Sequence, residues 1–136
     1  MKIICTGNTG ESLPVRYWGH GYSQATRFEF VIGTEYMVYS ICLYQDSLLY
    51  LLVGDGDGLR PAWYPAELFQ VTNGELPSTW QYAFFGFESQ LNAIWGYDEL
   101  VNVPEYFDDL SNLEEPAELT FWKRKQEIDN LYSSRE

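Results

Sequence analysis

Two cysteines and one histidine are the residues of this chain that could form a nucleophilic dyad. Cys5 and Cys42 each lie in an apolar run, and His20 lies among glycines and aromatic residues. A cysteine becomes a nucleophile when a neighbouring base or positive charge lowers its pKa. No local motif supplies such a base, and an apolar run is the usual setting of a buried free cysteine. We therefore predict no catalytic residue and no enzymatic activity, and a dyad of His20 with a cysteine stays open only because such partners meet in space.

Asp55 and Asp57 alternate with glycines and could supply oxygen ligands to a cation. The spacing resembles the start of a calcium loop, but the twelfth position counted from Asp55 is Ala66, where an EF-hand needs a bidentate Glu. The cysteines also lack the C-x-x-C spacing of zinc sites. The sequence predicts neither a metal nor another cofactor, with a weak surface cation site at the two aspartates as the alternative.

Acidic residues dominate the charge of the chain. Its 136 residues include 20 Asp and Glu against 8 Lys and Arg, which gives a formal net charge of -12. Nucleic acids and anionic membranes are bound through clustered Lys and Arg, so we expect neither as a partner. A basic protein partner fits the charge better. The sequence shows no signal-peptide core and no apolar stretch long enough for a membrane helix, so we expect a cytoplasmic protein.

The acids are concentrated toward the C-terminal end. Between Arg60 and Lys123 there is no Lys or Arg, and eight of the eleven acids in this segment fall within residues 98–118. Large apolar residues are interleaved with them, and aromatic anchors beside a carboxylate rim are typical of an interface for a cationic protein. The predicted partner-binding residues are the acids Asp98, Glu99, Glu105, Asp108, Asp109, Glu114 and Glu115, with Trp95, Tyr97 and Tyr106 as anchors. A solvated acidic surface over ordinary core aromatics is the alternative.

Short strands followed by helices must position these residues. After a first strand near Ile3, the β-branched and aromatic runs expected as strands are 28–32, 36–44, 48–53, 62–71, 80–87 and 91–97. Residues 7–26 favour an irregular loop, and residues 45–47 a three-residue hairpin turn. Helices are expected at 104–110 and from Pro116 to about 132, the second burying Phe121, Ile128 and Tyr132 together with Leu119 and Trp122.

We therefore expect one domain over residues 1–136, mainly β with C-terminal α. Residues 28–97 would form a small β-barrel or a strongly bent antiparallel sheet, and residues 98–132 an acidic helical part with one or two helices.

Two resemblances refine this expectation. The segments 36–41, 50–53 and 61–71 resemble an SH3-like barrel, in which a turn near a proline precedes a short final strand, as in Tyr64 to Phe69. The tryptophan pair and first-strand tyrosine motif of peptide-binding SH3 domains are not visible, so this resemblance implies architecture alone. The whole chain, with Leu13-Pro14 and the segments 93–97 and 121–129, resembles small bacterial proteins that include immunity proteins of polymorphic or contact-dependent toxin systems.

The second resemblance implies a protein that binds a cognate toxin domain, basic and of the nuclease type, and neutralises it by covering its site. Three other functions fit the sequence. An acidic mimic of nucleic acid would carry its carboxylates along an elongated face. A small-ligand-binding or enzymatic domain would line a pocket with aromatic residues, and the candidates are Trp18, Tyr22, Trp63, Tyr64 and Trp80. An oligomerising scaffold would expose strand edges.

Overall fold

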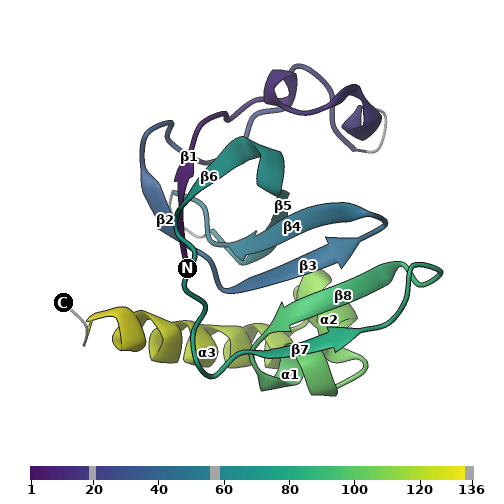
Figure 1. Cartoon of the computed structure of the whole chain (residues 1–136), viewed down its shortest axis with the longest axis vertical. Helices are drawn as coiled ribbons and strands as arrows, with labels where there is room; N and C mark the ends of the chain where they lie inside the picture. The colour runs from purple at the N-terminus through teal and green to yellow at the C-terminus, as the bar shows by residue number, and fades with distance from the viewer. Residues whose placement is uncertain (19–20, 56–58, 134–136) are drawn as a thin grey trace.

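The computed structural model describes residues 1–18, 21–55 and 59–133. Over these residues the chain forms two antiparallel sheets followed by three helices (Figure 1). The three-stranded sheet has the order β2-β1-β6, with β1 at Lys2–Cys5, β2 at Glu35–Met37 and β6 at Phe69–Asn73. The five-stranded sheet has the order β5-β4-β3-β8-β7, with β3 at Ser40–Tyr44, β4 at Ser47–Leu52, β5 at Ala62–Pro65, β7 at Gln81–Phe84 and β8 at Leu91–Gly96.

Three helices complete the chain, α1 at Asp98–Asn102, α2 at Tyr106–Ser111 and α3 at Glu115–Ser133. They lie along the face of the five-stranded sheet that points away from the three-stranded sheet (Figure 1). The helices expected at 104–110 and from Pro116 are confirmed as α2 and α3, whereas α1 was not predicted. Among the described residues, no helix combines the length and apolar character that a membrane crossing requires.

The two sheets are joined at two corners. The chain passes from β2 to β3 across Val38 and Tyr39, and from β5 to β6 through a turn of 3-10 helix at Ala66–Leu68. The sequence predicted a small β-barrel or a strongly bent antiparallel sheet. No ladder of hydrogen bonds links the two sheets in the described part of the chain, so these residues form no closed barrel but a mixed α/β structure with two sheets. Pro65 ends β5 without an N–H group, and the 3-10 turn then redirects the chain, so β5 and β6 do not pair with each other.

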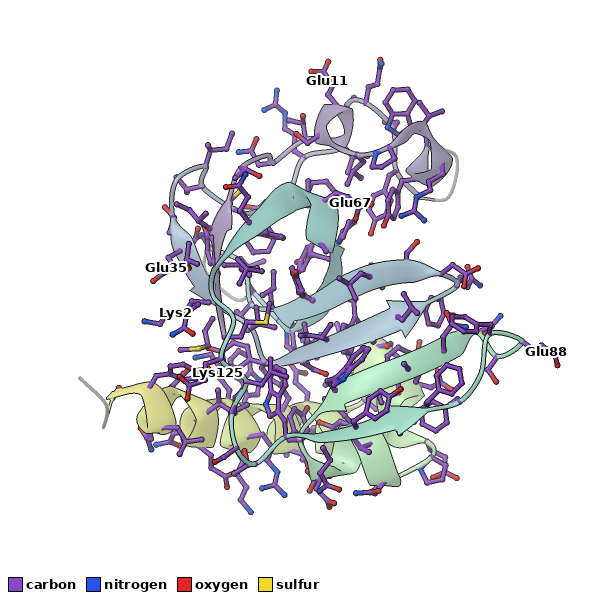
Figure 2. All side chains as sticks on the ribbon, viewed as in Figure 1. Lys2, Glu11, Glu35, Glu67, Glu88 and Lys125 are labelled. Carbon is purple, nitrogen blue, oxygen red and sulfur yellow. The ribbon has the colours of Figure 1, made fainter. Side chains whose placement is uncertain are left out.

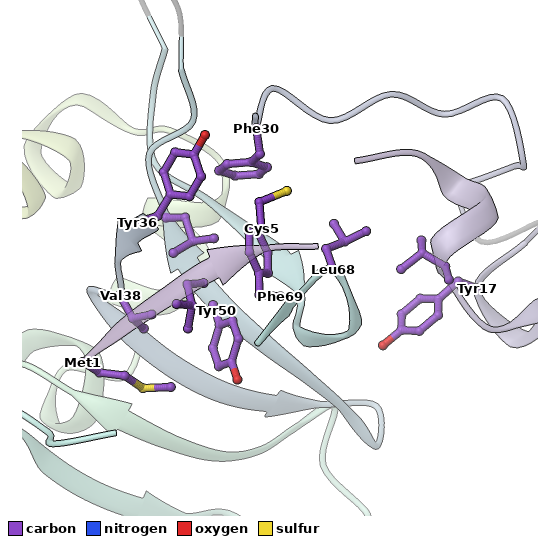
Figure 3. Close-up of a cluster of buried hydrophobic side chains, with 12 residues drawn as sticks. Met1, Cys5, Tyr17, Phe30, Tyr36, Val38, Tyr50, Leu68 and Phe69 are labelled. Carbon is purple, nitrogen blue, oxygen red and sulfur yellow. The ribbon is translucent and has the colours of Figure 1, made fainter. Parts of the chain in front are cut away.

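A hydrophobic core fills each side of the five-stranded sheet. Side chains alternate between the two faces of a strand, so on β4 Tyr50 and Leu52 face the three-stranded sheet whereas Leu51 faces the helices. Figure 3 shows the first core, in which Phe69 and Leu68 pack beside β1. The second core lies between the sheet and the helices and includes the residues Tyr39, Cys42, Ile94, Leu110 and Phe121.

Several sequence predictions about β structure were wrong. The runs 36–44 and 62–71, each expected as one strand, are each divided between the two sheets, as β2 with β3 and as β5 with β6. Residues 28–32 form no strand, although Phe28 and Phe30 both turn toward the core. Phe30 packs its ring 4.7 Å from the Tyr64 ring, while Val31 and Ile32 stay exposed. The β3–β4 hairpin turn has two residues instead of three. Gln45 and Asp46 both have positive φ, at 48° and 64°, the geometry of a type I′ turn that suits the twist of paired strands.

The buried face of α3 is partly as predicted. Phe121, Ile128 and Tyr132 are buried, in agreement with their helical spacing. Leu119 is 63% exposed and points away from the core, so the predicted extension of this face through Leu119 was wrong. Trp122 lies at the edge, where its ring packs 5.2 Å from that of Phe121.

Candidate partner-binding site

Two buried tyrosines fix the position of α2. The Tyr106 hydroxyl donates a hydrogen bond to the Ala117 carbonyl on α3 over 3.1 Å and lies 2.5 Å from the Tyr97 hydroxyl, which therefore acts as the donor between the two. Burial raises the pKa of Tyr106 to about 12, so the hydroxyl stays protonated at neutral pH. Tyr97 and Tyr106 were predicted as anchors for a partner, but they lie in the core and offer no surface to one.

The two acids of α1 are held by groups of the protein itself. Glu99 forms a bidentate ion pair with Arg124 of α3, with nitrogen–oxygen distances of 2.8 and 2.9 Å. This guanidinium lowers the pKa of the Glu99 carboxyl. Asp98 accepts hydrogen bonds from the side-chain amides of Asn102, at 2.8 Å, and of Gln81, at 3.3 Å. Both acids therefore fasten α1 to its neighbours, and Glu99 is not free to meet a partner.

Besides Asp98, five of the predicted acids are exposed. They occupy α2 and the turns on either side of it, and we call them the acidic patch: Glu105, Asp108, Asp109, Glu114 and Glu115. None of them forms an ion pair with another described residue. The patch is compact, because α2 has 6 residues and a helix rises by about 1.5 Å per residue. A compact patch argues against an elongated mimic of nucleic acid.

A groove of about 580 Å³ lies beside the acidic patch, between the hairpin end of the sheet and helices α1 and α2. The rings of Tyr44 and Phe107 stack at its wall with their centroids 5.9 Å apart. Phe85 and Val103 are exposed within it, and Asp108 of the acidic patch is the carboxylate that lines it. Apolar walls beside a concentration of negative charge can accept the aliphatic stem and charged head of a Lys or Arg side chain.

Trp95 does not join this site. It faces the opposite side of the five-stranded sheet, where it is paired with Ile41 and Tyr82 on the neighbouring strands and packs 5.0 Å from the Tyr82 ring. Its neighbour Ile94 is the residue that points toward the helices. The predicted anchor is therefore separated from the acidic patch by the sheet itself.

The predicted aromatic pocket is also not assembled. Trp63 packs with the helix-side core, whereas Tyr64, Tyr22 and Trp80 pack against the core on the other side of the sheet. Trp18 donates its ring N–H to the Gly10 carbonyl over 3.0 Å and serves the N-terminal loop. These five rings therefore do not surround one ligand.

The described thiols are poor nucleophiles. Cys5 and Cys42 are buried, and burial raises the pKa of both thiols, so neither is a thiolate at neutral pH. His20 and Asp57, which the dyad and the weak cation site would need, lie outside the described residues. Among the residues that are described, no three His, Cys, Asp or Glu side chains gather as metal ligands would.

Sequence reasoning found the five carboxylates of the acidic patch but missed the groove beside them. Tyr44 and Phe107 come from distant parts of the chain, and no local pattern announces their contact. Comparison of the chain with protein-family models, with curated proteins and with solved structures found no match. The function is therefore argued from the groove and the patch.

Proposed function

We propose that the protein binds a basic protein domain through the groove and the acidic patch, and so acts as an immunity protein that neutralises a toxin. The observation that carries this proposal is the lack of internal neutralisation: five exposed carboxylates beside an apolar groove have no ion-pair partner among the described residues. Three cations of the protein are engaged in other ion pairs. Arg124 pairs with Glu99, Arg60 with Glu118 and Lys125 with Asp129.

Binding would combine steering with local packing. The net charge of -12 attracts a basic domain from a distance and accelerates its encounter with this surface. A side chain entering the groove would pack against Phe107 and Phe85 while its charged end meets Asp108. The apolar walls would pack against the stem of that side chain, whereas Asp108 is exposed, so the charge pair itself would contribute modestly.

A nuclease toxin is the partner that the proposal favours. Such a toxin holds nucleic acid in a basic groove, so carboxylates placed where phosphates bind would block its substrate. The immunity protein would then act in the cytoplasm, where the toxin acts.

The strand order also supports an SH3-like origin for residues 1–73. The segments β1, β2 with β3, β4, β5, the 3-10 turn and β6 follow one another as the strands of that fold do, and β6-β1-β2 and β3-β4-β5 form its two halves. We propose that β7, β8 and the helices are an addition to the free edge of β3. Apart from Tyr44 of β3, the residues that line the groove belong to this addition.

The test compares two variants with equal net charge. The first neutralises four of the five carboxylates of the acidic patch through Asp108→Asn, Asp109→Asn, Glu114→Gln and Glu115→Gln. The second neutralises four exposed acids elsewhere through Glu11→Gln, Glu29→Gln, Asp46→Asn and Glu88→Gln, of which Glu11 and Glu88 are labelled in Figure 2. Each protein is used to capture partners from a lysate of the source organism, and the captured protein is purified for kinetic measurements.

We expect the wild type and the second variant to retain one basic protein that binds with 1:1 stoichiometry and loses its activity in the complex. The patch variant should associate with it about tenfold more slowly at low salt, the lower end of electrostatic steering effects. Both variants have the same net charge, so an equal loss would show that only the overall charge matters. Equal loss, or binding that is unchanged in the patch variant, would overturn the proposed site.

A further inference from the structure

A charge-free segment crosses the surface of this acidic protein. Residues 76–87 contain no Asp, Glu, Lys or Arg. Within it, Tyr82 and Phe84 of β7 are 54% and 52% exposed, and they point to the face of the sheet that carries Trp95. Isolated exposed apolar residues are common, but a contiguous aromatic strip on a single strand marks a contact surface.

β7 is also a free edge. In the described part of the chain it pairs with β8 alone and ends the five-stranded sheet (Figure 1). The Phe85 N–H donates to the Asn92 carbonyl over 2.7 Å. Backbone groups alternate in direction along an antiparallel strand. The N–H and C=O groups of Ala83 therefore also point toward β8, whereas those of Tyr82 and Phe84 point outward. Natural edge strands are usually protected by Lys, Pro or a bulge, and β7 has none of these.

We propose that β7 pairs with β7 of a second copy of this chain, antiparallel and about a two-fold axis at Ala83. In this register Tyr82 of each copy lies opposite Phe84 of the other, and the outward groups of these two residues supply both donors and acceptors. The two sheets join into one, with Ala83 facing its own copy as a small residue at the closest approach.

The side chains suit this register as well as the backbone does. The Tyr82 ring already packs 5.0 Å from Trp95, and Phe84 packs 5.4 Å from Phe87. Directly opposite residues in an antiparallel pair have Cβ atoms about 5 Å apart, so Tyr82 and Phe84 of the two copies would be in contact. The dimer would form a continuous aromatic row across the axis on one face of the joined sheet.

The distribution of charge around β7 favours a second copy of this chain as its partner. A basic partner, which suits the acidic patch, would find no carboxylate at the centre of this strip. An equally acidic copy, which would be repelled elsewhere on the surface, meets no like charge there. Asp98, which accepts a hydrogen bond from Gln81, and Glu88 lie at the two ends of the strip. Salt would screen their repulsion and strengthen the dimer, whereas salt weakens the binding of a basic partner.

The first measurement is sedimentation of the purified wild-type chain at increasing concentration in 0.05 M and 0.5 M salt, conditions between which screening changes strongly. We expect a monomer–dimer equilibrium that shifts toward the dimer at the higher salt. A matched pair of variants then locates the interface. Phe84→Asp places a charge in the strip, and Leu119→Asp places the same charge at an exposed apolar position on α3. Phe84→Asp should raise the dimer dissociation constant by at least ~100-fold, because it buries an unpaired charge in each copy, and Leu119→Asp should leave it unchanged.

A crosslink tests the register. Ala83→Cys would place two thiols across the axis at a non-hydrogen-bonded pair, whose Cα separation of about 4.5 Å lies within the range of a disulfide. Mild oxidation should convert this variant to a covalent dimer, while Leu119→Cys should form no covalent dimer under the same conditions. Cys5 and Cys42 are buried and provide a low background.

A wild-type chain that stays monomeric in high salt, a dimer that survives Phe84→Asp, or a dimer that Ala83→Cys fails to crosslink would each overturn the proposal. None of these results would bear on the acidic patch. The groove lies on the helix side of the sheet, and its partner binding is measured with different variants and has the opposite salt dependence.

Discussion

The Tyr106 hydroxyl offers a direct test of whether this residue is a core element or a contact for a partner. Tyr106→Phe keeps the ring and removes the hydrogen bonds that connect it to Tyr97 and to the Ala117 carbonyl. Both groups lose a partner in a buried setting, and an unsatisfied buried group costs about 1 to 3 kcal/mol. From the middle of this range we expect a loss of about 2 kcal/mol in the free energy of unfolding.

That loss is measurable in a chain of this size. It corresponds to a fall in Tm of roughly 8 °C, because about 1 kcal/mol shifts Tm by about 4 °C in domains of this length. Urea unfolding followed by circular dichroism gives the free energy, and thermal unfolding gives Tm. The control is Tyr82→Phe, which removes an exposed hydroxyl for which no hydrogen bond is found among the described residues, and it should change stability by less than about 0.5 kcal/mol.

Tyr106→Ala extends the test by removing the ring. It should cost about 3 to 5 kcal/mol, the range for emptying an aromatic site in a core. Because Tyr106 offers no surface to a partner, folded protein of either variant should bind the partner less tightly only if the substitution shifts α2 and the acidic patch with it. A Tyr106→Phe variant that is as stable as the wild type but dissociates faster from its partner would refute the core assignment.

Three further predictions concern titratable groups. Glu99→Gln should lower the free energy of unfolding by about 1 to 2 kcal/mol at pH 7 through loss of the ion pair with Arg124; because this pair lowers the pKa of Glu99 below 4.5, urea unfolding should show the difference from wild type shrinking as the pH falls below that value. Burial raises the pKa of Tyr36 and Tyr106 to about 12, so these two tyrosines contribute a constant amount to stability below pH 10. Between pH 10 and 12 the tyrosines ionise in the unfolded chain but not in the native protein, so the free energy of unfolding should fall over this range. Absorbance at alkaline pH together with urea midpoints would detect the fall. Cys5 and Cys42 should react with a thiol reagent at least about a hundredfold more slowly in the native protein than in urea, and rapid native labelling would contradict their burial.

Charge was the feature that the sequence revealed most clearly about the site. The acids of α2 alternate with Tyr106 and Leu110, which are spaced to share one helix face, so the exposed position of Asp108 and Asp109 follows from local periodicity. The ion pair of Glu99 does not follow from local periodicity, because its partner Arg124 lies 25 residues further along the chain, on α3. An ion pair between distant segments leaves no local trace in a sequence.

The orientation of β8 shows a second limit. Ile94 and Trp95 are both apolar, so alternation along the strand could not tell which of them faces the helices. The answer depends on pairing with β3, where Ile94 lies beside Cys42 and Trp95 beside Ile41. A strand with a core on one face and an aromatic surface on the other has no polar face to reveal its register.

The barrel expectation failed for a related reason. Local runs identified most strands between residues 36 and 97, but they carry no information on which edges meet. β3 does not end its sheet, because β8 pairs with the edge of β3 that β4 leaves open. α3 covers the face of this sheet that points away from the three-stranded sheet. These long-range pairings, rather than the strands themselves, decide between a closed barrel and two sheets.

The hairpin of β3 and β4 contributes to both hydrophobic cores, and this has a consequence for how the native protein opens. Tyr50 and Leu52 belong to one core and Leu51 to the other, so the loss of either core would expose one face of β4. Amide hydrogen exchange should therefore be slowest in this hairpin and should report global unfolding there. The edge strand β7 and the N-terminal loop should exchange through local openings of much lower free energy, which leaves the contact surfaces free to adjust while the centre of the sheet remains closed.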